Sequence, residues 1–271
     1  MDGTSPRLWP YAANNSPLPL PTHAVLYSPE AVVSLAFEAA RTADAEPLDG
    51  DAVLEYARGY AANGTSLDDM LVACGAEPLE ARRPILLQGE LANPYRLQEM
   101  GMSPLPLLPV RLEDLCRTWA DGLDPRDEYP GVHHVTLART PGWWEASVLG
   151  LATKEQLKLI RTWLDNGVPH VWRPVKLAEG GVRFEHQPLE PPSQADVEWD
   201  GTIERVSRTP PAVTGPLLSL DDLLVVVHTR QGCYNHRGRL ARCVHMQQRA
   251  FHDQLFRKGS SHRWNDVLTV R

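Results

Sequence analysis

The sequence lacks long apolar runs, and it contains few cysteines. No stretch reaches the roughly 18 consecutive apolar residues typical of a membrane-spanning helix. Residues 1–21 have neither a basic start nor a continuous apolar segment, so we expect no secretory signal. The 4 cysteines in 271 residues are irregularly spaced, which is typical of reduced thiols in a cytosolic protein. We therefore expect a soluble, cytoplasmic protein with no membrane partner.

The common catalytic signatures are also missing. Glycine-rich phosphate loops, metalloprotease helices and nucleophile elbows do not occur, and we expect no cofactor. The composition, with 42% hydrophobic and 23% charged residues, is that of a globular chain that can bury a sizeable core. Many of the 24 prolines are clustered, which predicts ordered connections between short elements.

Charge is distributed unevenly along the chain. The segment from His228 to the last residue carries nine Lys and Arg residues against two acidic ones, Asp253 and Asp266. The preceding residues keep 18 basic and 32 acidic side chains (27 − 9 and 34 − 2). The chain thus combines an acidic body with a basic C-terminal segment.

The order of the expected elements predicts an α+β fold, because helices come first and strands later. We expect an extended Pro-rich arm over residues 1–22 and a single α+β domain over 23–271. That domain divides into a helical half at about 23–130, a mainly antiparallel β half at about 131–229, and the basic segment 230–271. Helices are predicted at 28–39, 51–62, 66–75, 111–120, 153–166 and 240–257. Strands are predicted at 132–138, 143–149, 168–176, 182–186, 202–207, 223–229 and 267–270. Of these, 168–176 and 182–186 are expected to form a hairpin.

Three segments, in this order, resemble papain-like cysteine peptidases. Residues 28–38 (SPEAVVSLAFE) resemble the family's nucleophile helix, and 54–58 with 64–71 resemble its second helix and the Gly-Thr-Ser-Leu entry to the next one. Residues 156–168 resemble the helix that begins its β half. The resemblance implies a papain-like α+β fold covering about half of the chain.

The catalytic positions implied by this resemblance do not hold catalytic residues. The nucleophile position falls on Ser28, which cannot form a thiolate, and the histidine position falls near Asp221 and Asp222. Papain-like catalysis requires a thiolate paired with an imidazole, and an ionised carboxylate such as that of Asp222 is a poor proton shuttle for an alcohol. The resemblance therefore predicts a pseudoenzyme.

The C-terminal segment contains residue types suited to zinc. Cys233, His236, Cys243 and His245 provide thiol and imidazole ligands. Their spacing matches no standard structural zinc site, and unrelated Cys and His residues explain the pattern more simply. Earlier in the chain, Cys74 is interpreted as a buried apolar cysteine.

The same segment supplies a candidate surface for a polyanion or a partner protein. Its cationic members are Arg230, Arg237, Arg239, Arg242, Arg249, Arg257, Lys258 and Arg263. Guanidinium groups suit phosphate, but a pI near 5.8 is not typical of a dedicated nucleic-acid binder. Internal pairing with the acidic body, a protein partner and a polyanion all remain open.

Two adjacent histidines, His133 and His134, precede a predicted strand. Side chains of neighbouring strand residues point to opposite faces, so we expect one packing residue and one surface residue.

Our leading functional prediction is a non-catalytic interaction or assembly protein, bacterial or phage, on a degenerate papain-like scaffold. The Pro-rich arm and the basic segment would contact partner proteins in a multi-subunit assembly. One alternative is a cysteine- or metal-dependent hydrolase using the C-terminal Cys and His residues. The other is a nucleic-acid or polyanion-binding accessory factor using the arginines.

Overall fold

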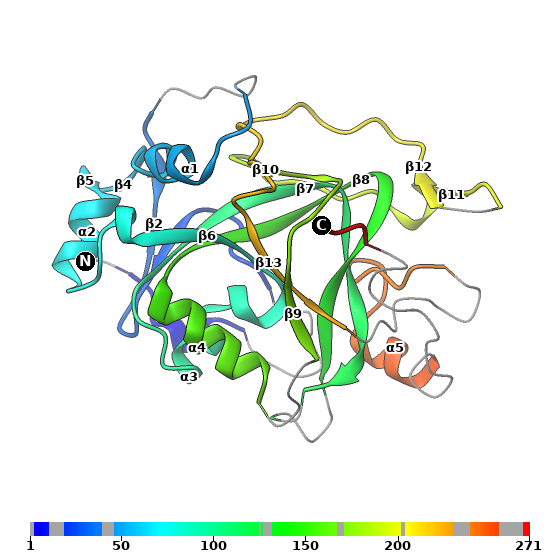
Figure 1. The fold of residues 1–271 in the computed structure, drawn as a ribbon, viewed down its shortest axis with the longest axis horizontal. Coiled ribbons are helices and arrows are strands. Elements are labelled where there is room, and N and C mark those ends of the chain that lie inside the picture. Colours follow the sequence, from blue (N-terminus) through cyan, green and yellow to red (C-terminus); the bar gives the residue numbers. More distant parts are fainter. Residues whose placement is uncertain are drawn as a thin grey trace.

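A large mixed sheet with short helices on both faces forms the centre of the molecule (Figure 1). The computed structural model describes residues 3–10, 19–39, 46–124, 126, 132–166, 171–201, 204–229, 239–254 and 268–271. The combination of helices with a large, mostly antiparallel sheet shows the α+β class expected from the sequence.

The helices are α1 (Gly50–Ala57), α2 (Leu67–Ala73), α3 (Pro94–Glu99), α4 (Lys154–Leu164) and α5 (Gln248–Gln254), with 3₁₀ turns η1 (Pro6–Leu8), η3 (Leu79–Ala81), η4 (Gly89–Ala92) and η5 (Gln194–Asp196). The strands are β1 (Val25–Tyr27), β2 (Val32–Ser34), β3 (Ala36–Phe37), β4 (Tyr60–Ala62), β5 (Thr65–Ser66), β6 (Arg82–Leu87), β7 (Leu105–Leu123), β8 (His133–Thr153), β9 (Trp172–Val175), β10 (Gly181–Phe184), β11 (Val197–Trp199), β12 (Glu204–Val206) and β13 (Leu224–His228).

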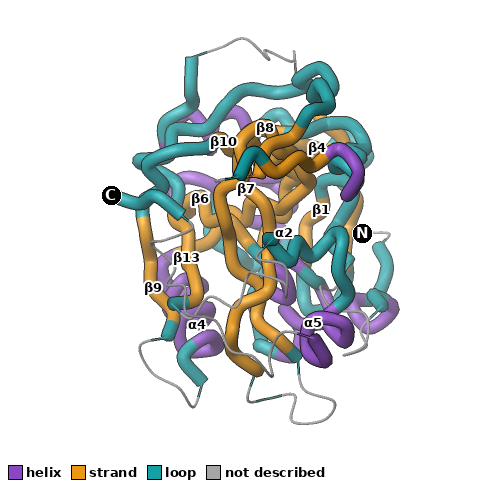
Figure 2. Tube along the Cα trace, turned by 90° about the vertical axis from the view of Figure 1, so that its right-hand side faces the viewer, coloured by secondary structure: helices purple, strands orange, loops and turns teal. Residues whose placement is uncertain are grey.

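The main sheet has the strand order β2-β1-β7-β8-β6-β13-β9, and β10 pairs with β7. The long strands β7 and β8 form a twisted antiparallel hairpin that runs through the whole molecule (Figure 2). β6 pairs antiparallel with β8 and parallel with β13, with Leu224 opposite Ile85. The parallel pair places the carboxyl ends of β6 and β13 at one edge of the sheet.

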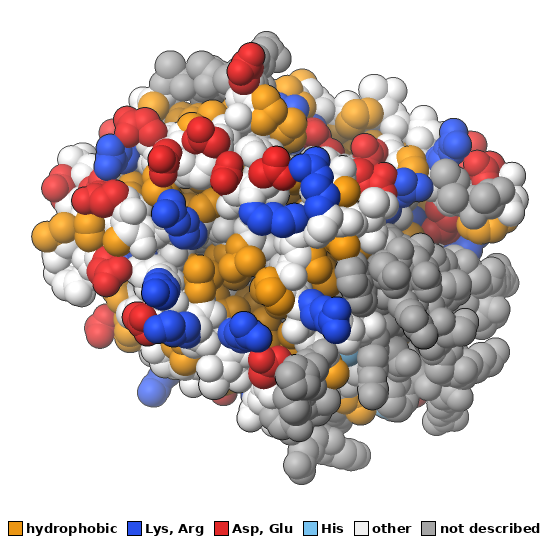
Figure 3. Space-filling model, in the orientation of Figure 1, with side chains coloured by type: hydrophobic (Ala, Val, Ile, Leu, Met, Phe, Trp, Pro, Cys, Tyr) orange, Lys and Arg blue, Asp and Glu red, His pale blue; other side chains and the backbone are white. Residues whose placement is uncertain are grey.

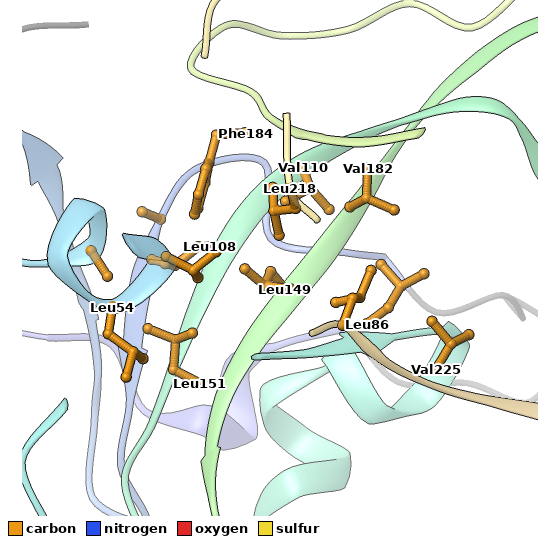
Figure 4. Packing of buried hydrophobic residues seen from close by; sticks show 14 of the residues in the cluster. Leu54, Leu86, Leu108, Val110, Leu149, Leu151, Val182, Phe184, Leu218 and Val225 are labelled. Atoms are coloured by element: carbon orange, nitrogen blue, oxygen red, sulfur yellow. The ribbon is translucent and has the colours of Figure 1, made fainter. Parts of the chain in front are cut away.

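Both faces of the sheet are covered, because side chains of successive strand residues alternate between the two faces. On one face, Leu108 and Leu149 pack in a cluster that includes Leu54 of α1 (Figure 4). On the other face, Leu107 and Val148 pack in a cluster that includes residues of α3 and α4. The sheet is thus held between α1 and α2 on one side and α3 and α4 on the other.

The helix predicted at residues 28–39 is wrong, because this segment forms the turn after β1 and the strands β2 and β3. The hydroxyl of Ser28 donates to the carbonyl of Ala31 at 3.0 Å and accepts its amide N–H at 3.1 Å. This closes a hairpin turn in which Tyr27 pairs with Val32. The turn residues and the β-branched Val32 and Val33 favour a hairpin over a helix.

The helix predicted at residues 111–120 is also wrong, because these residues belong to β7. A bulge lies at Asp114, where φ is +57° and the register with β8 shifts. Between the pairs Glu113–Trp144 and Leu115–Arg139, one residue of β7 faces four residues of β8, so the extra residues lie on β8. The left-handed backbone at Asp114 lets Leu112 and Leu115 reach the same core although they are three positions apart. A helix-like spacing of apolar residues therefore arises from a bulged strand.

Other predictions are confirmed in type but not always in extent. Helices occur at α1, α2 and α4, and the apolar run 223–229 forms β13. The runs 132–138 and 143–149 are parts of one continuous strand, β8. β9 and β10 do not form the predicted hairpin, since β9 pairs with β13 and β10 with β7. Of the predicted helix at 240–257, the described residues are helical only in α5.

The N-terminal arm is partly described. Thr4 pairs with Val32, and Trp9 packs against the core cluster that contains α3 and α4. Residues 4–9 therefore pack against other parts of the same chain.

No helix in the described part of the chain has both the length and the apolar character needed to span a membrane.

Candidate functional site

Polar side chains follow the carboxyl ends of the parallel strands β6 and β13. Gln88 and Glu90 come directly after β6, and His228 is the last residue of β13. Gly89, with a φ of +54°, turns the chain from β6 into η4. Because the carboxyl ends of parallel strands meet at the same edge, residues that follow β6 and β13 come together here, which makes this edge a candidate site.

Arg126 lies between two carboxylates at this edge. Its guanidinium contacts Glu90 and Asp124, with Nε 2.7 Å from Asp124 Oδ1. Glu90 also accepts a hydrogen bond from Trp163 Nε1 at 3.2 Å and lies 3.1 Å from Arg96 Nε. The guanidinium carbon of Arg126 stacks 3.9 Å from the centre of the Trp163 ring.

The two carboxyl groups differ in acidity. Burial and the nearby charge of Asp124 raise the pKa of Glu90 to about 7, and the arginines only partly oppose this. Burial also acts on Asp124, but the hydrogen bonds and charge of Arg126 bring its pKa below the usual value. Two neighbouring acids with separated pKa values are typical of acid–base sites. Glu90 can therefore exchange a proton near neutral pH while Asp124 stays ionised.

Three aromatic rings extend the site along the sheet edge. The ring centre of His134 lies 5.0 Å from that of Trp172 and 5.2 Å from that of His228. A Cβ at Gly122 would lie 2.8 Å from the His228 ring, so a larger residue here would displace that ring. Burial and the neighbouring His228 lower the pKa of His134 to about 3, and the ring is neutral at physiological pH.

Several buried polar atoms around this edge have no hydrogen-bond partner among the described residues. They are Gln88 Oε1, Arg126 Nη1 and Trp172 Nε1. The other end of the Gln88 amide donates to the carbonyl of Val226 at 3.3 Å. Buried polar groups are normally satisfied, so one acceptor and two donors at the same edge favour a polar ligand or ordered water.

An apolar groove of about 270 Å³ adjoins this cluster. It lies between α4 and the strands β6, β13 and β9, which are neighbours in Figures 1 and 2. Trp172 belongs to both, since it lines the groove and its ring contacts His134 and His228. We call the polar cluster and this groove together the carboxyl-edge site. A concave apolar surface with a few converging polar groups is the usual form of a ligand site.

Ser28, the nucleophile position of the resemblance, is not placed for catalysis. Its hydroxyl is used in the β1–β2 turn, and it lines a cavity of about 380 Å³ together with Cys74. No histidine lines this cavity among the described residues. Asp222 is exposed and lies in the turn before β13, facing Gly50. The structure does not bring Ser28 and Asp222 into one cavity.

The C-terminal Cys and His residues are only partly described. Cys233 and His236 lie outside the described residues. Cys243 is buried, and burial raises its pKa well above the ordinary thiol value, so it is not an activated nucleophile. His245 Nε2 lies 2.8 Å from the carbonyl oxygen of Pro192. Within the described ranges, no three His, Cys, Asp or Glu side chains converge on a possible metal site.

The residues of the expected basic surface are also only partly described. Arg230, Arg237, Arg257, Lys258 and Arg263 lie outside the described residues. Arg242 corrects the prediction, because it is buried and its guanidinium donates to Glu204 at 2.8 Å and to Thr140 at 3.0 Å. Arg239 lies 3.9 Å from the same Glu204, and Arg249 is exposed. Of the three interpretations left open for this segment, internal pairing describes Arg242.

The carboxyl-edge site was missed in the sequence. The run Ile85–Leu87 followed by glycine would have indicated a buried strand, with Gln88 and Glu90 at its end. The predicted surface role for one of the two adjacent histidines is wrong, because His133 and His134 are both buried. Arg126 and Asp124 carried no sequence signal that links them to Glu90.

No protein-family model matches this chain, and no curated protein or solved structure was found to match it significantly. The papain-like resemblance is therefore neither supported nor contradicted by these comparisons, and it stays a prediction.

Proposed function

We propose that this protein is an enzyme that binds a small organic substrate at the carboxyl-edge site and uses Glu90 as a general base. The observation that carries the proposal is the environment of Glu90. Its carboxyl is mostly buried among Arg96, Arg126 and Trp163, with a pKa of about 7. A general base works best when its pKa lies near the operating pH.

The neighbouring residues support this role in distinct ways. Arg126 holds the carboxyl of Glu90 next to Asp124, and its stacking on Trp163 fixes the guanidinium plane. Its free Nη1 can bind an oxygen of the substrate, and so can Trp172 Nε1. His134 is neutral, so it can act as a hydrogen-bond partner without adding a positive charge.

The proposal is tested first by measuring the ionisation of Glu90. With ¹³C-labelled glutamate carboxyls, one NMR resonance of the wild type should titrate near pH 7 and be missing in Glu90→Gln. Glu99→Gln is the matched control, because Glu99 pairs with the same Arg96 at 2.8 Å but lies in the more exposed position. A Glu90 midpoint below pH 5 would exclude the proposed role.

The second test measures turnover with a panel of small esters, amides and carbon acids. Glu90→Gln should lower kcat by about 10²–10⁴-fold, the usual contribution of a general base. For the wild type, kcat/KM should rise with pH up to about 7 and then level off, because the base must be ionised. Turnover by Glu90→Gln at the wild-type rate contradicts the proposal.

The interaction role predicted from the sequence stays a prediction. It is tested by capture of a stable partner with the full chain, and the proposed acid–base role does not depend on that outcome.

A further inference from the structure

The apolar groove beside α4 has uncovered apolar residues on an interior strand. β13 lies between β6 and β9, yet Leu224 and Val226 on its α4-facing side are only half-buried. Side chains on an interior strand are normally covered on both faces. The floor of the groove continues to the exposed Pro174 of β9 on one side and to the buried Ile85 of β6 on the other.

The rim of the groove is cationic. Lys154, Lys158 and Arg161 of α4 line it, and among the described residues no acidic side chain does so. Lys158 pairs with Glu155, and Arg161 lies 3.7 Å from Asp165. Those cations are exposed, and exposed ion pairs contribute little, so the side chains are free to bind another anion. Figure 3 shows apolar side chains in this region with Lys and Arg around them.

The size of the groove limits what it can bind. Its volume of about 270 Å³ lies just below the range of roughly 300–1,000 Å³ typical of small-molecule pockets. This volume suits a short aliphatic or aromatic body.

We infer that the groove binds a small amphiphilic anion, with its apolar body on Leu224 and Val226 and its anionic group against the cations of α4. The inference names the class of ligand for the groove part of the carboxyl-edge site, and it does not require the proposed acid–base role, because no groove residue takes part in the proton transfer.

Binding is measured by isothermal titration calorimetry with octanoate, octanol and octylammonium as probes, on the full chain below their micellar concentrations. Octanoate should bind at least tenfold more tightly than octanol, and octylammonium more weakly than either. The triple variant Lys154→Gln/Lys158→Gln/Arg161→Gln should bind octanoate no more tightly than octanol.

Two controls separate the contribution of the cations to binding from that of the apolar floor. The variant Arg7→Gln/Arg83→Gln/Arg205→Gln removes the same charge from exposed positions outside the groove and should keep the octanoate affinity. Val226→Thr keeps the side-chain shape but adds a hydroxyl to the floor, so both octanoate and octanol should bind more weakly.

Equal binding of octanoate by the triple variant and the wild type overturns the inference, as does the absence of octanoate binding. Tighter binding of a synthetic acidic amphipathic peptide than of octanoate also overturns it, in favour of a peptide partner. Octanoate binding is measured without turnover, and the titration of Glu90 is measured without octanoate, so failure of the acid–base proposal is distinguishable from failure of this one.

Discussion

Buried charged and titratable side chains determine much of the behaviour of this chain at the level of single residues. Arg82, Arg111, Arg117 and Arg242 are all buried. Arg117 pairs with Glu145 at 3.1 Å, and Arg82 donates to main-chain carbonyls of Leu151 and Glu77. Arginine is suited to such positions because its planar group satisfies several acceptors at once. A high arginine content therefore does not by itself indicate a binding surface.

His134 makes stability sensitive to acid. Its folded-state pKa of about 3 lies below the unfolded value of 6.5, so the unfolded chain binds the proton more readily. The stabilisation is present above pH 6.5 and is lost as the pH falls towards 3. For His134→Phe, which keeps an aromatic ring against Trp172, the loss of unfolding free energy between pH 7 and pH 4 should be smaller by about 3 kcal/mol.

Urea unfolding at both pH values checks this expectation, with near-UV circular dichroism confirming that the variant keeps its packing. An identical pH dependence in the wild type and His134→Phe would show that the ring is protonated or exposed in the folded protein.

At the level of elements, local signals identified the helices with strong caps. Ser66 accepts the N–H of Asp69 at the start of α2, and Thr153 and Gln156 form the predicted capping box of α4. Long-range pairing could not be deduced in the same way. The bulge at Asp114 gave β7 a helix-like spacing, and β9 and β10 pair with distant strands that local sequence does not specify.

The candidate site could not be predicted from local sequence either. Glu90, Asp124 and His228 come from three separate parts of the chain, and only the order of strands in the sheet brings them to one edge. A sequence pattern therefore could not assemble them.

The capping box at the N-terminus of α4 should contribute to the stability of this helix, which carries Trp163. Thr153→Ala removes the acceptor for the Gln156 amide N–H and should cost about 1 kcal/mol of unfolding free energy. Gln156→Ala should cost more, because the same side chain also bonds Arg82 and Ser103 in the interior.

Thr153→Ser is the matched control for this element, since it keeps the capping oxygen and should stay within a few tenths of a kcal/mol of the wild type. Urea unfolding measures all three variants. A larger loss for Thr153→Ser than for Thr153→Ala would contradict the capping explanation.

At the scale of the whole molecule, the β7–β8 hairpin joins the four apolar clusters formed by the described residues. It contributes Leu108 and Leu107 to the two large clusters on the faces of the sheet. It also contributes Cys116 and Trp119 to the two smaller clusters near its far end. No cluster can therefore be lost without disturbing the hairpin.

This arrangement predicts one cooperative unfolding transition. Far-UV circular dichroism and tryptophan fluorescence should give the same midpoint in urea, because the tryptophans Trp119 and Trp143 lie in clusters attached to the same hairpin. Two separate midpoints, with fluorescence changing first, would show that the far end of the hairpin unfolds independently of the sheet.

The parallel pairing of β6 with β13 has a consequence for biosynthesis. The partner of β6 on this side is translated about 140 residues later, and β9 also waits for β13 as its partner. At about 5–20 residues per second, the nascent chain exposes an apolar strand edge for about 7–28 seconds. Such an edge recruits other strands, so ribosome-associated chaperones have a defined segment to protect until β13 emerges.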